Sequence, residues 1–391
     1  MLRSYHVLQL TVIAMLGLAQ VAVRSAGMSV GQTDGDSGWL IVDRTLVYAV
    51  LAVTAMIVAS QINVRQTMRV RGCRNPLAWV LIGSLVLLGL TFIPGMGRSV
   101  NGASRWLYLG PSAWGLSFQP SELVKWVMVL CMAWWCSRRW SMMHRFARGL
   151  LPALVLIGFA AGLVMVEDLG TGLLIGLVAM CLLIAGGARL WHLAIMVPLA
   201  GVAVAVGVWT NPYRWNRLTS FLDPWADPYG SGYHAIQSML AFAQGGLAGR
   251  GLGNGVQKFG YLPEDTTDFI FATICEEMGV VGAILVVVLY LVLFWVGLGI
   301  VRDSKDMFGR LVGLGVLLTI AFQSLMNLAV VTVVVPTKGI ALPLLSSGGT
   351  GWIMAAACVG LVAALDRGNE LEAEESEGGE EIGDVVVRAC S

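Results

Sequence analysis

Long apolar runs recur along this 391-residue chain, and they constrain its fold more than any other feature. A helix that crosses a bilayer needs about 20 predominantly apolar residues. Because lipid offers no hydrogen-bond partners, a spanning segment must satisfy its own backbone as a helix. We therefore predict an all-α polytopic membrane protein with about ten transmembrane helices. The candidate spans are residues 5–24, 40–61, 77–95, 119–136, 149–166, 170–187, 190–209, 269–300, 311–335 and 344–366.

The composition agrees with this fold class. Charged residues make up 13% of the chain, about half the share of a typical soluble domain. The net charge of +1 gives no indication of nucleic acid or another polyanionic partner. The seven cysteines form no C-x-x-C pair and the four histidines lack metal-ligand spacing, so we predict neither a disulfide framework nor a protein-held metal site.

Cations are concentrated in alternate short loops. The loops 62–76 and 137–148 carry four arginines each, and further cations follow spans six and eight at Arg189, Arg302, Lys305 and Arg310. Short cytoplasmic loops are enriched in Lys and Arg. This pattern predicts a multi-pass protein with these loops and both termini in the cytoplasm.

The domain organisation follows from the spans. We expect one transmembrane domain over residues 1–366, with a long extracytoplasmic loop at about 210–268 between spans seven and eight. A loop of that length is usually functional or disordered, and its aromatic content argues against disorder. Within it, Tyr233–Phe242 predicts a short amphipathic helix at the membrane interface. Residues 367–391 are expected to form an acidic, disordered cytoplasmic tail.

Ionisable groups inside spans are rare and are functional candidates by default. Glu122 and Lys125 lie at i, i+3, so they share one helix face. Either a structural ion pair or a functional role fits them. Asp168 follows Glu167 at the end of span five, and one of these two acids could cap the next helix or take part in catalysis.

Two adjacent acids lie about two turns into span eight. The side chains of Glu276 and Glu277 point about 100° apart on a helix. At most one is therefore expected to face a polar cavity, and we keep Glu277 as the candidate. The nearby run Gly249-x-Gly251-x-Gly253-x-Gly255 follows no predicted strand, so we reject nucleotide binding.

Asp268 ends the long loop, directly before the apolar run Phe269-Ile270-Phe271. One interpretation is a cap or first-turn acid of span eight, which the helix dipole favours. The same position places a carboxylate at the outer boundary between water and membrane. A general base acting on a lipid-linked substrate has to lie there.

The loop and its surroundings resemble the SEDS family (shape, elongation, division and sporulation), the group of FtsW, RodA and SpoVE. The resemblance covers roughly residues 43 to 366. Its first motifs are Asn101-Gly-Ala-Ser-Arg-Trp-Leu, Gln119-Pro-Ser-Glu-Leu-Val-Lys125, Asp168-Leu-Gly-Thr171 and Phe221-Leu-Asp-Pro-Trp-Ala-Asp-Pro-Tyr-Gly-Ser-Gly-Tyr233. The later motifs are Gly251-Leu-Gly-Asn-Gly-Val-Gln-Lys-Phe-Gly-Tyr-Leu-Pro-Glu264, Thr267-Asp-Phe-Ile-Phe271, Pro336-Thr-Lys-Gly339 and Leu342-Pro-Leu-Leu-Ser-Ser-Gly-Gly349. Pro336-Thr-Lys-Gly339 and the stretch at Asp223 are more similar to the FtsW branch than to the RodA branch.

The resemblance implies a peptidoglycan glycosyltransferase that acts on lipid II in the bacterial cytoplasmic membrane. It implies ten helices with a large extracytoplasmic loop between helices seven and eight. It assigns the essential aspartate to Asp268, a functional tryptophan to Trp106, and a polar pair to Glu122 and Lys125. It also implies partners: a class B penicillin-binding protein, the transpeptidase that cross-links the new strand, and other division or elongation proteins.

The chain departs from the family pattern at two motifs. The family usually has E-P-D before G-T, whereas this chain has Val166-Glu167-Asp168. The family usually has S-Y-G-G near the end of the domain, whereas this chain has Ser347 at the position of the tyrosine. These departures bear on the subfamily and on any role of Glu167 and Ser347.

The implied reaction defines the remaining candidates. Lipid II is a disaccharide-pentapeptide on a polyprenyl diphosphate, so its polymerisation needs a base, cations for the diphosphate and an apolar path for the lipid. We expect Asp268 to be the base. The candidate substrate contacts are Trp106, Arg214, Arg217, Lys258 and Glu264, with Arg250 as a further loop cation. Each loop cation could instead pair with Asp223, Asp227 or a lipid headgroup.

Other interpretations stay open at this point. A divalent cation such as Mg²⁺ or Mn²⁺ could share the diphosphate work, although the sequence shows no dedicated ligand cage. One alternative function is a lipid II flippase with Glu122, Lys125 and Glu277 lining a path. Another is a non-catalytic scaffold of the division machinery. The many polar residues of the outer loop favour surface chemistry.

Overall fold

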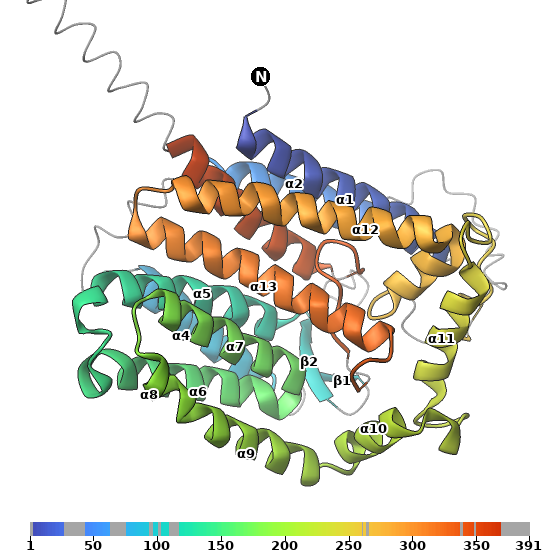
Figure 1. Cartoon of the computed structure of the whole chain (residues 1–391), viewed down its shortest axis with the longest axis horizontal. Coiled ribbons are helices and arrows are strands. Elements are labelled where there is room, and N and C mark those ends of the chain that lie inside the picture. Colours follow the sequence, from blue (N-terminus) through green and yellow to red (C-terminus); the bar gives the residue numbers. More distant parts are fainter. Residues whose placement is uncertain are drawn as a thin grey trace, which may run out of the picture.

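The computed structural model describes residues 3–26, 44–62, 76–93, 97–100, 103–108, 117–259, 261–262, 266–336, 339–347 and 349–368. Over these residues the chain is a bundle of long helices that run roughly along one direction, with α10 and α11 crossing one end (Figure 1). The first half contains α1 (Ser4–Ala26), α2 (Arg44–Ala59), α4 (Pro76–Leu90), β1 (Gly97–Val100), β2 (Ala103–Tyr108), β3 (Ser117–Phe118), α5 (Pro120–Arg138), η3 (Trp140–Met142), η4 (Phe146–Leu150), α6 (Leu151–Glu167) and α7 (Leu169–Ala185). The second half contains α8 (Leu190–Ala194), α9 (Met196–Trp209), α10 (Pro212–Leu222), η5 (Pro224–Ala226), α11 (Tyr233–Gly245), α12 (Ile270–Asp303), α13 (Met307–Val331) and a last helix, Thr350–Gly368.

A helix coincides with each predicted span, and the chain is a multi-pass membrane protein. Among the described residues, six helical segments are long and apolar enough to cross a membrane. The apolar helices α2, α4 and α7 are shorter, and α5 carries Glu122 and Lys125 within its first turns. The exact number of ten crossings therefore stays a prediction.

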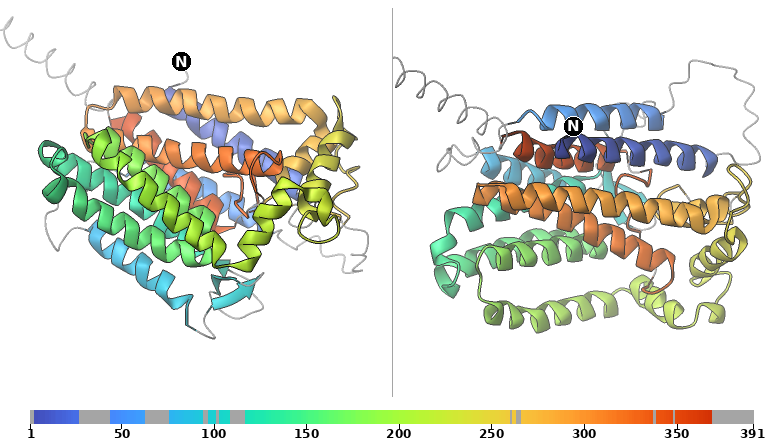
Figure 2. Two further views of the ribbon diagram at one scale, coloured as in Figure 1. Left: turned by 60° about the horizontal axis from the view of Figure 1, so that its bottom comes forward. Right: turned by 45° about the horizontal axis from the view of Figure 1, so that its top comes forward.

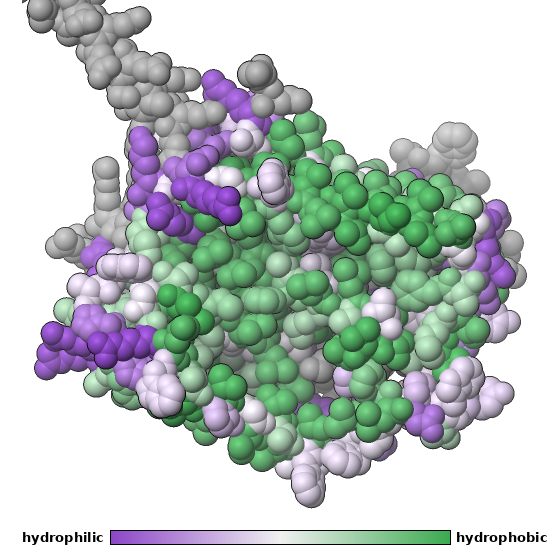
Figure 3. Space-filling view, in the orientation of Figure 1, coloured by the Kyte–Doolittle hydropathy of each residue, from purple (hydrophilic) through white to green (hydrophobic). Residues whose placement is uncertain are grey.

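The molecular surface agrees with a membrane environment. In the face shown in Figure 3, a broad hydrophobic band covers the helices, and hydrophilic residues gather toward the ends. The span Leu190–Trp209 has a solvent-facing or lipid-facing tryptophan near each end, Trp191 and Trp209. Tryptophan is enriched at both membrane–water interfaces because its ring is amphipathic.

One departure from an all-helical fold lies between α4 and α5. Strands β1, β2 and β3 form a small antiparallel sheet in that order, with Val100 paired to Ala103 across a two-residue connection. The connecting dipeptide is Asn101-Gly102, which favours tight hairpins because both residues tolerate positive φ. The sheet brings Trp106 toward the bundle.

The centre of the bundle is α13, which packs against α5, α7 and α12, while α1 packs along α12. Helix α9 differs from these. Its main contacts are with α8 and α10, and none of its side chains is buried. In the right-hand view of Figure 2 the yellow-green α9 runs along the lower edge of the molecule. This loose attachment leaves room for a cavity between α9 and the body of the bundle.

The long loop is ordered largely by helices. The predicted helix at Tyr233–Phe242 is present as α11, but it docks on α12 with Ala235, Ile236 and Ala241 buried. Ser238 Oγ also donates a hydrogen bond to Val331 O at the end of α13 (2.6 Å). We did not predict α10, whose sequence mixes Arg214, Trp215, Arg217 and Leu218 within one short helix.

Candidate functional site

Asp268 lies where three parts of the fold meet. Helix α12 begins at Ile270 with Phe269 as its N-cap residue, so Asp268 precedes the cap position that one sequence interpretation gave it. The Asp268 carbonyl accepts a hydrogen bond from Asn327 Nδ2 on α13 (2.7 Å), and the same amide nitrogen donates to Ile340 O (2.7 Å). A Cβ atom at Gly339 would lie 2.8 Å from Asp268 Oδ2. Asp268 is therefore held close against α13 and the segment that follows it.

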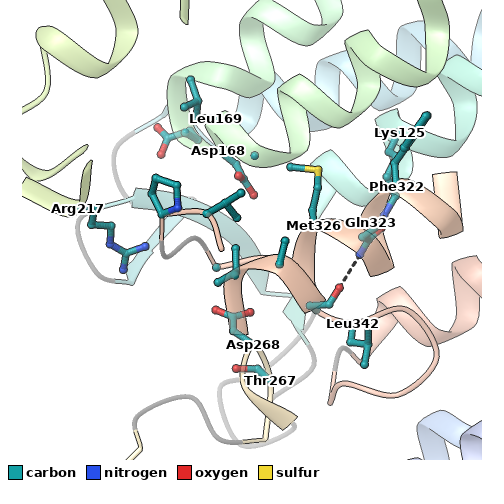
Figure 4. Close-up of a pocket in the computed structure, with 18 of the residues that line it drawn as sticks. Lys125, Asp168, Leu169, Arg217, Thr267, Asp268, Phe322, Gln323, Met326 and Leu342 are labelled. Carbon is teal, nitrogen blue, oxygen red and sulfur yellow. Dashed lines mark hydrogen bonds between the residues drawn. The ribbon is translucent and has the colours of Figure 1, made fainter. Parts of the chain in front are cut away.

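A cavity of about 1690 Å³ opens in front of this aspartate. It is lined by charged residues from several elements, including Glu122, Lys125, Glu167, Asp168, Arg214, Arg217 and Asp268. Figure 4 shows Asp268, Arg217, Asp168 and Lys125 around this cavity, each from a different element. Trp106, which is half-buried on β2, also lines it.

One part of the cavity wall is apolar. Val204, Ala205 and Val208 of α9 form part of the lining, and Met326 and Val330 of α13 form another part. The cavity thus joins a charged region near Asp268 to a slot between α9 and α13. Such a shape suits a ligand with an anionic head and a long apolar tail.

Glu122 and Lys125 form the predicted ion pair. Lys125 Nζ lies 2.6 Å from Glu122 Oε2, and Lys125 is only 3% exposed. Its ammonium also donates to Gln323 Oε1 on α13 (2.8 Å), and Gln323 Nε2 donates to Ala341 O (2.9 Å). This chain of bonds links α5 to α13 and to Ala341, whose neighbour Ile340 shares the Asn327 amide with the Asp268 carbonyl.

Asp168 caps a helix. It is the N-cap residue of α7, where Oδ1 accepts from the Thr171 backbone N–H (3.1 Å) and Oδ2 accepts from Thr171 Oγ1 (2.8 Å). The sequence left open whether Glu167 or Asp168 would cap this helix, and the geometry assigns the cap to Asp168. The same side chain lines the cavity.

The two arginines of α10 both line the cavity, and the hydrogen bonds of Arg214 also hold two helix ends together. Arg214 Nη2 donates to the carbonyls of Met165 (3.0 Å) and Val166 (2.9 Å) at the end of α6, and Nη1 donates to Gly207 O on α9 (3.1 Å). Arg214 therefore joins two helix ends whose last carbonyls lack helical partners. It lines the cavity, but its donors are largely occupied. Arg217 also lines the cavity and is a candidate for binding an anionic ligand.

Two of the sequence candidates, Lys258 and Glu277, do not join the others. Lys258 and Glu277 are both 3% exposed, pair with each other at 3.2 Å, and lie outside the cavity lining. This placement argues against the expected contact of Lys258 with a substrate, because the ammonium is enclosed by protein. It also separates Glu277 from the path expected to contain Glu122 and Lys125. Glu264 lies outside the described residues.

The acids of the long loop satisfy their own turns. Asp223 accepts from the Trp225 backbone N–H (3.1 Å), and Asp227 accepts from Ser231 N (2.8 Å) and Ser231 Oγ (3.1 Å). The two hydrogen bonds from Ser231 hold the pKa of Asp227 below its ordinary value. These acids fix the turns that lead from α10 to α11.

Neutral polar residues that were not predicted from the sequence organise the site. Gln323 and Asn327 lie one turn apart on α13 and hold carbonyls of the segment after it, and His234 lines the cavity while stacking on Phe269 (14° between rings). The signal was available, because two amides at i, i+4 within an apolar run share one face. Among the described residues, no cluster of three or more His, Cys, Asp or Glu side chains could hold a metal ion.

Comparison with known proteins gives consistent matches along the chain. A family model described as cell cycle protein, which comprises FtsW, RodA and SpoVE, matches residues 5–371. A protein of Geobacter metallireducens named "Probable peptidoglycan glycosyltransferase FtsW" is 36% identical over 357 residues, which are 91% of this chain and 92% of that protein. A protein of the same name from Thioalkalivibrio sulfidiphilus is 37% identical over 365 residues, which are 92% of this chain and 88% of the relative.

Two solved structures share the fold. A chain from a peptidoglycan synthase complex superposes with a TM-score of 0.72 at 29% identity, covering 92% of this chain and 96% of that one. The crystal structure of the rod shape determining protein RodA from Thermus thermophilus gives a TM-score of 0.64 at 25% identity, covering 92% and 95%.

Proposed function

We propose that this chain, which belongs to the family of cell cycle proteins comprising FtsW, RodA and SpoVE, is a peptidoglycan glycosyltransferase that polymerises lipid II. Its relatives of 36% and 37% identity bear the name FtsW, so cell division is the expected setting. The observation that carries the proposal is the cavity, in which Asp268 and Arg217 share one space with an apolar slot.

The chemistry assigns one role to each part of the cavity. Asp268 accepts the proton of the attacking sugar hydroxyl, whose oxygen then bonds to the anomeric carbon of the second substrate. The bond from that carbon to the diphosphate breaks, and the diphosphate leaves with the electron pair. Arg217 binds the leaving diphosphate, because a guanidinium presents paired donors to phosphate oxygens. Trp106 lies on the wall where a sugar ring would pack.

The lipid would occupy the slot between α9 and α13. Val204, Val208, Met326 and Val330 line it and offer no charge to a polyprenyl chain. Because α9 has no buried side chain, an apolar chain can enter this slot from the membrane at a small loss of packing.

The orientation is part of the same proposal. The segment between α5 and α6, whose sequence contains Arg138, Arg139, Arg145 and Arg148, lies at the end of the bundle opposite α10 and α11 (Figure 1). By the positive-inside rule that end is cytoplasmic, together with both termini. The cavity entrance near Asp268 then faces the outer surface of the cytoplasmic membrane, where lipid II is consumed.

A class B penicillin-binding protein is the expected partner. A chain of a peptidoglycan synthase complex shares this fold over 92% of the present chain, which supports assembly with a cross-linking enzyme. Affinity purification of the tagged protein from dividing cells should recover a membrane transpeptidase. Recovery of the chain alone, under conditions that preserve other membrane complexes, would contradict this part of the proposal.

The decisive experiment is glycan synthesis from purified lipid II, with the transpeptidase present. We expect the wild-type protein to make polymer and Asp268→Asn to lose about 10²–10⁴ in rate, at normal membrane yield. The matched control is Asp227→Asn, which changes an exposed acid of the same loop and should retain activity.

The same experiment separates the alternatives. A flippase would move lipid II across vesicles without forming polymer, and a scaffold would bind the division machinery without either activity. Polymer formation by Asp268→Asn at the wild-type rate would exclude the assigned base. The position of Glu277, outside the cavity that contains Glu122 and Lys125, already counts against a flippase path through all three residues.

A further inference from the structure

Two buried acids of α12 have no part in the chemistry proposed above. Glu276 is 0% exposed and Glu277 is 3% exposed, and neither lines the cavity. Ionisable groups buried at the membrane boundary are costly, so they are retained where they bind something specific. Their partners identify what they hold.

Glu277 joins three segments that are distant in sequence. Its carboxylate lies 3.2 Å from Lys258 Nζ and accepts a hydrogen bond from Ser25 Oγ near the end of α1 (2.6 Å). Lys258 Nζ also donates to Gly253 O (2.6 Å) and Ser25 Oγ (3.4 Å). An ammonium has three donors, and these three bonds use all of them. Lys258 therefore keeps no donor for a diphosphate.

Glu276 fastens the loop to the same helix. Its carboxylate accepts from the backbone N–H groups of Val256 (2.7 Å) and Gln257 (3.2 Å). The helix itself is broken at Gly279, where φ is 64° and ψ is −155°. A break frees backbone groups that need partners elsewhere.

The glycine-rich segment supplies those partners. The carbonyls of Glu276 and Glu277 accept from Arg250 N (3.0 Å) and Gly251 N (2.9 Å), and Val280 N donates to Gly246 O (3.1 Å). The approach is so close that a Cβ at Gly249 would lie 2.1 Å from Glu277 O. The glycine run thus binds the backbone groups that the break in α12 leaves free, and we call this set of hydrogen bonds the seal. The run does not form a phosphate-binding loop.

Asp268 lies about midway along the sequence between Lys258 and Glu277. The ion pair closes this stretch into a loop. The two ends of the loop are held together, at what we call its neck, by the Lys258–Glu277 pair and by the hydrogen bonds of Glu276 to the loop backbone. On the far side, Asn327 holds the carbonyl of Asp268, and Ser347 N donates to Thr266 O (2.9 Å). Closing a loop at its neck removes conformational freedom from the residues inside it.

We propose that Lys258 and Glu277, with Ser25, are positioning residues that hold Asp268 at the geometry needed for transfer. This inference rests on the proposed function of Asp268 as the base. The pair acts through the first turns of α12, which run from Ile270, two residues after Asp268, past Glu277 to the break at Gly279. Ser25 lies on α1 and binds the same ion pair, so the position of Asp268 is fixed relative to the helices of the bundle.

The test compares polymerisation kinetics of folded variants with lipid II, in the complex with the transpeptidase. Lys258→Met combined with Glu277→Gln removes the ion pair, leaves no unpaired buried charge, and keeps an acceptor for Ser25. We expect kcat to fall roughly 10–100-fold, since a misplacement of about 1 Å costs on the order of 10²-fold. The KM for lipid II should change less than about threefold, because these residues do not touch the substrate.

The matched control is Arg250→Met. Its side chain is exposed and lies outside the cavity lining, so the structure does not support the substrate contact that the sequence allowed; only its backbone N–H takes part in the seal, so kcat should be unchanged. Hydrogen exchange gives a second measurement that does not depend on activity. The amides of residues 270–277 should exchange faster in the double variant than in the wild-type protein and in Arg250→Met.

Three outcomes would overturn the inference. The first is a double variant with the kcat and exchange of the control. The second is a raised KM at unchanged kcat, which would make Lys258 a substrate contact. The third applies if the double variant does not accumulate, and it uses Ser25→Ala, which removes one small donor. An unchanged kcat of Ser25→Ala would contradict the inference, whereas a fall in kcat would support it. Absence of polymer from the wild-type protein would instead overturn the proposed function.

Discussion

Lys125 is bound by two side chains from different helices, Glu122 on its own helix and Gln323 on α13. The ammonium is enclosed, whereas the Glu122 side chain keeps 16% of its exposure. Removing one partner of a fully buried pair costs about 3–5 kcal/mol. Because Glu122 is partly exposed, we expect Lys125→Met to lose stability near the lower end of that range.

The charge swap tests whether this pair is structural. Glu122→Lys combined with Lys125→Glu restores opposite charges at the same spacing. The carboxylate at position 125 would then need the Gln323 amide nitrogen, which now donates to Ala341 O. The stability of the swap variant should remain below that of the wild-type protein by about one hydrogen bond, on the order of 1 kcal/mol. Thermal unfolding in detergent measures this, and a swap no more stable than Lys125→Met would refute a structural pair. A stable but inactive swap would assign the pair a role in positioning the site.

Arg214 and Arg217 allow a second comparison between single residues of one helix. Arg214 binds three carbonyls of α6 and α9, so Arg214→Ala should destabilise the protein by about 1.5–3 kcal/mol or more. Arg217→Ala should raise the KM for lipid II, because its side chain lines the cavity. Unfolding curves for Arg214→Ala and initial rates for Arg217→Ala check these expectations. An Arg214→Ala variant as stable as wild type, or an Arg217→Ala variant with the wild-type KM, would contradict the assigned role.

At the scale of elements, the break in α12 explains why the long loop has a glycine at position 249. Gly249 and Gly253 both have positive φ, of 77° and 83°. An alanine in this region is strained by roughly 1–2 kcal/mol. At Gly249 the new Cβ would also meet Glu277 O at 2.1 Å, whereas nothing lies within 4 Å of a Cβ at Gly253.

The two glycines should therefore respond differently to the same change. Gly253→Ala should fold with a small loss, and Gly249→Ala should lose more than about 4 kcal/mol and accumulate poorly in the membrane. Membrane yield and thermal unfolding of the two variants give the comparison. If Gly249→Ala is as stable as Gly253→Ala, the seal between the loop and α12 is not formed as described.

For the whole molecule, we expect charge to set the orientation. The described cationic segments, between α5 and α6 and between α12 and α13, lie at one end of the bundle, and the loop that bears Asp268 lies at the other (Figure 1). A topology reporter at Gly230 should be extracytoplasmic, and reporters at Arg69 and Glu375 should be cytoplasmic. Fusion activity in intact cells checks these positions. A cytoplasmic signal from Gly230 would overturn both the orientation and the site that depends on it.

The sequence by itself determined the fold class and the position of the helices. Apolar runs locate spans because each span satisfies its own backbone, which is a local property. The span predicted at 269–300 is α12 (Ile270–Asp303), and that at 5–24 is α1 (Ser4–Ala26). The pairing of Glu122 with Lys125 is also local, because i, i+3 residues share a helix face.

Only the tertiary structure decided what the remaining polar residues bind. Lys258 and Arg217 are both loop cations in the sequence, yet Lys258 is enclosed by Ser25, Gly253 and Glu277 while Arg217 faces the cavity. The partners of Lys258 lie 233 and 19 residues away at Ser25 and Glu277, so no local pattern encodes the choice. The physical reason is that a buried charge is stabilised by whichever groups the packing of distant helices brings to it.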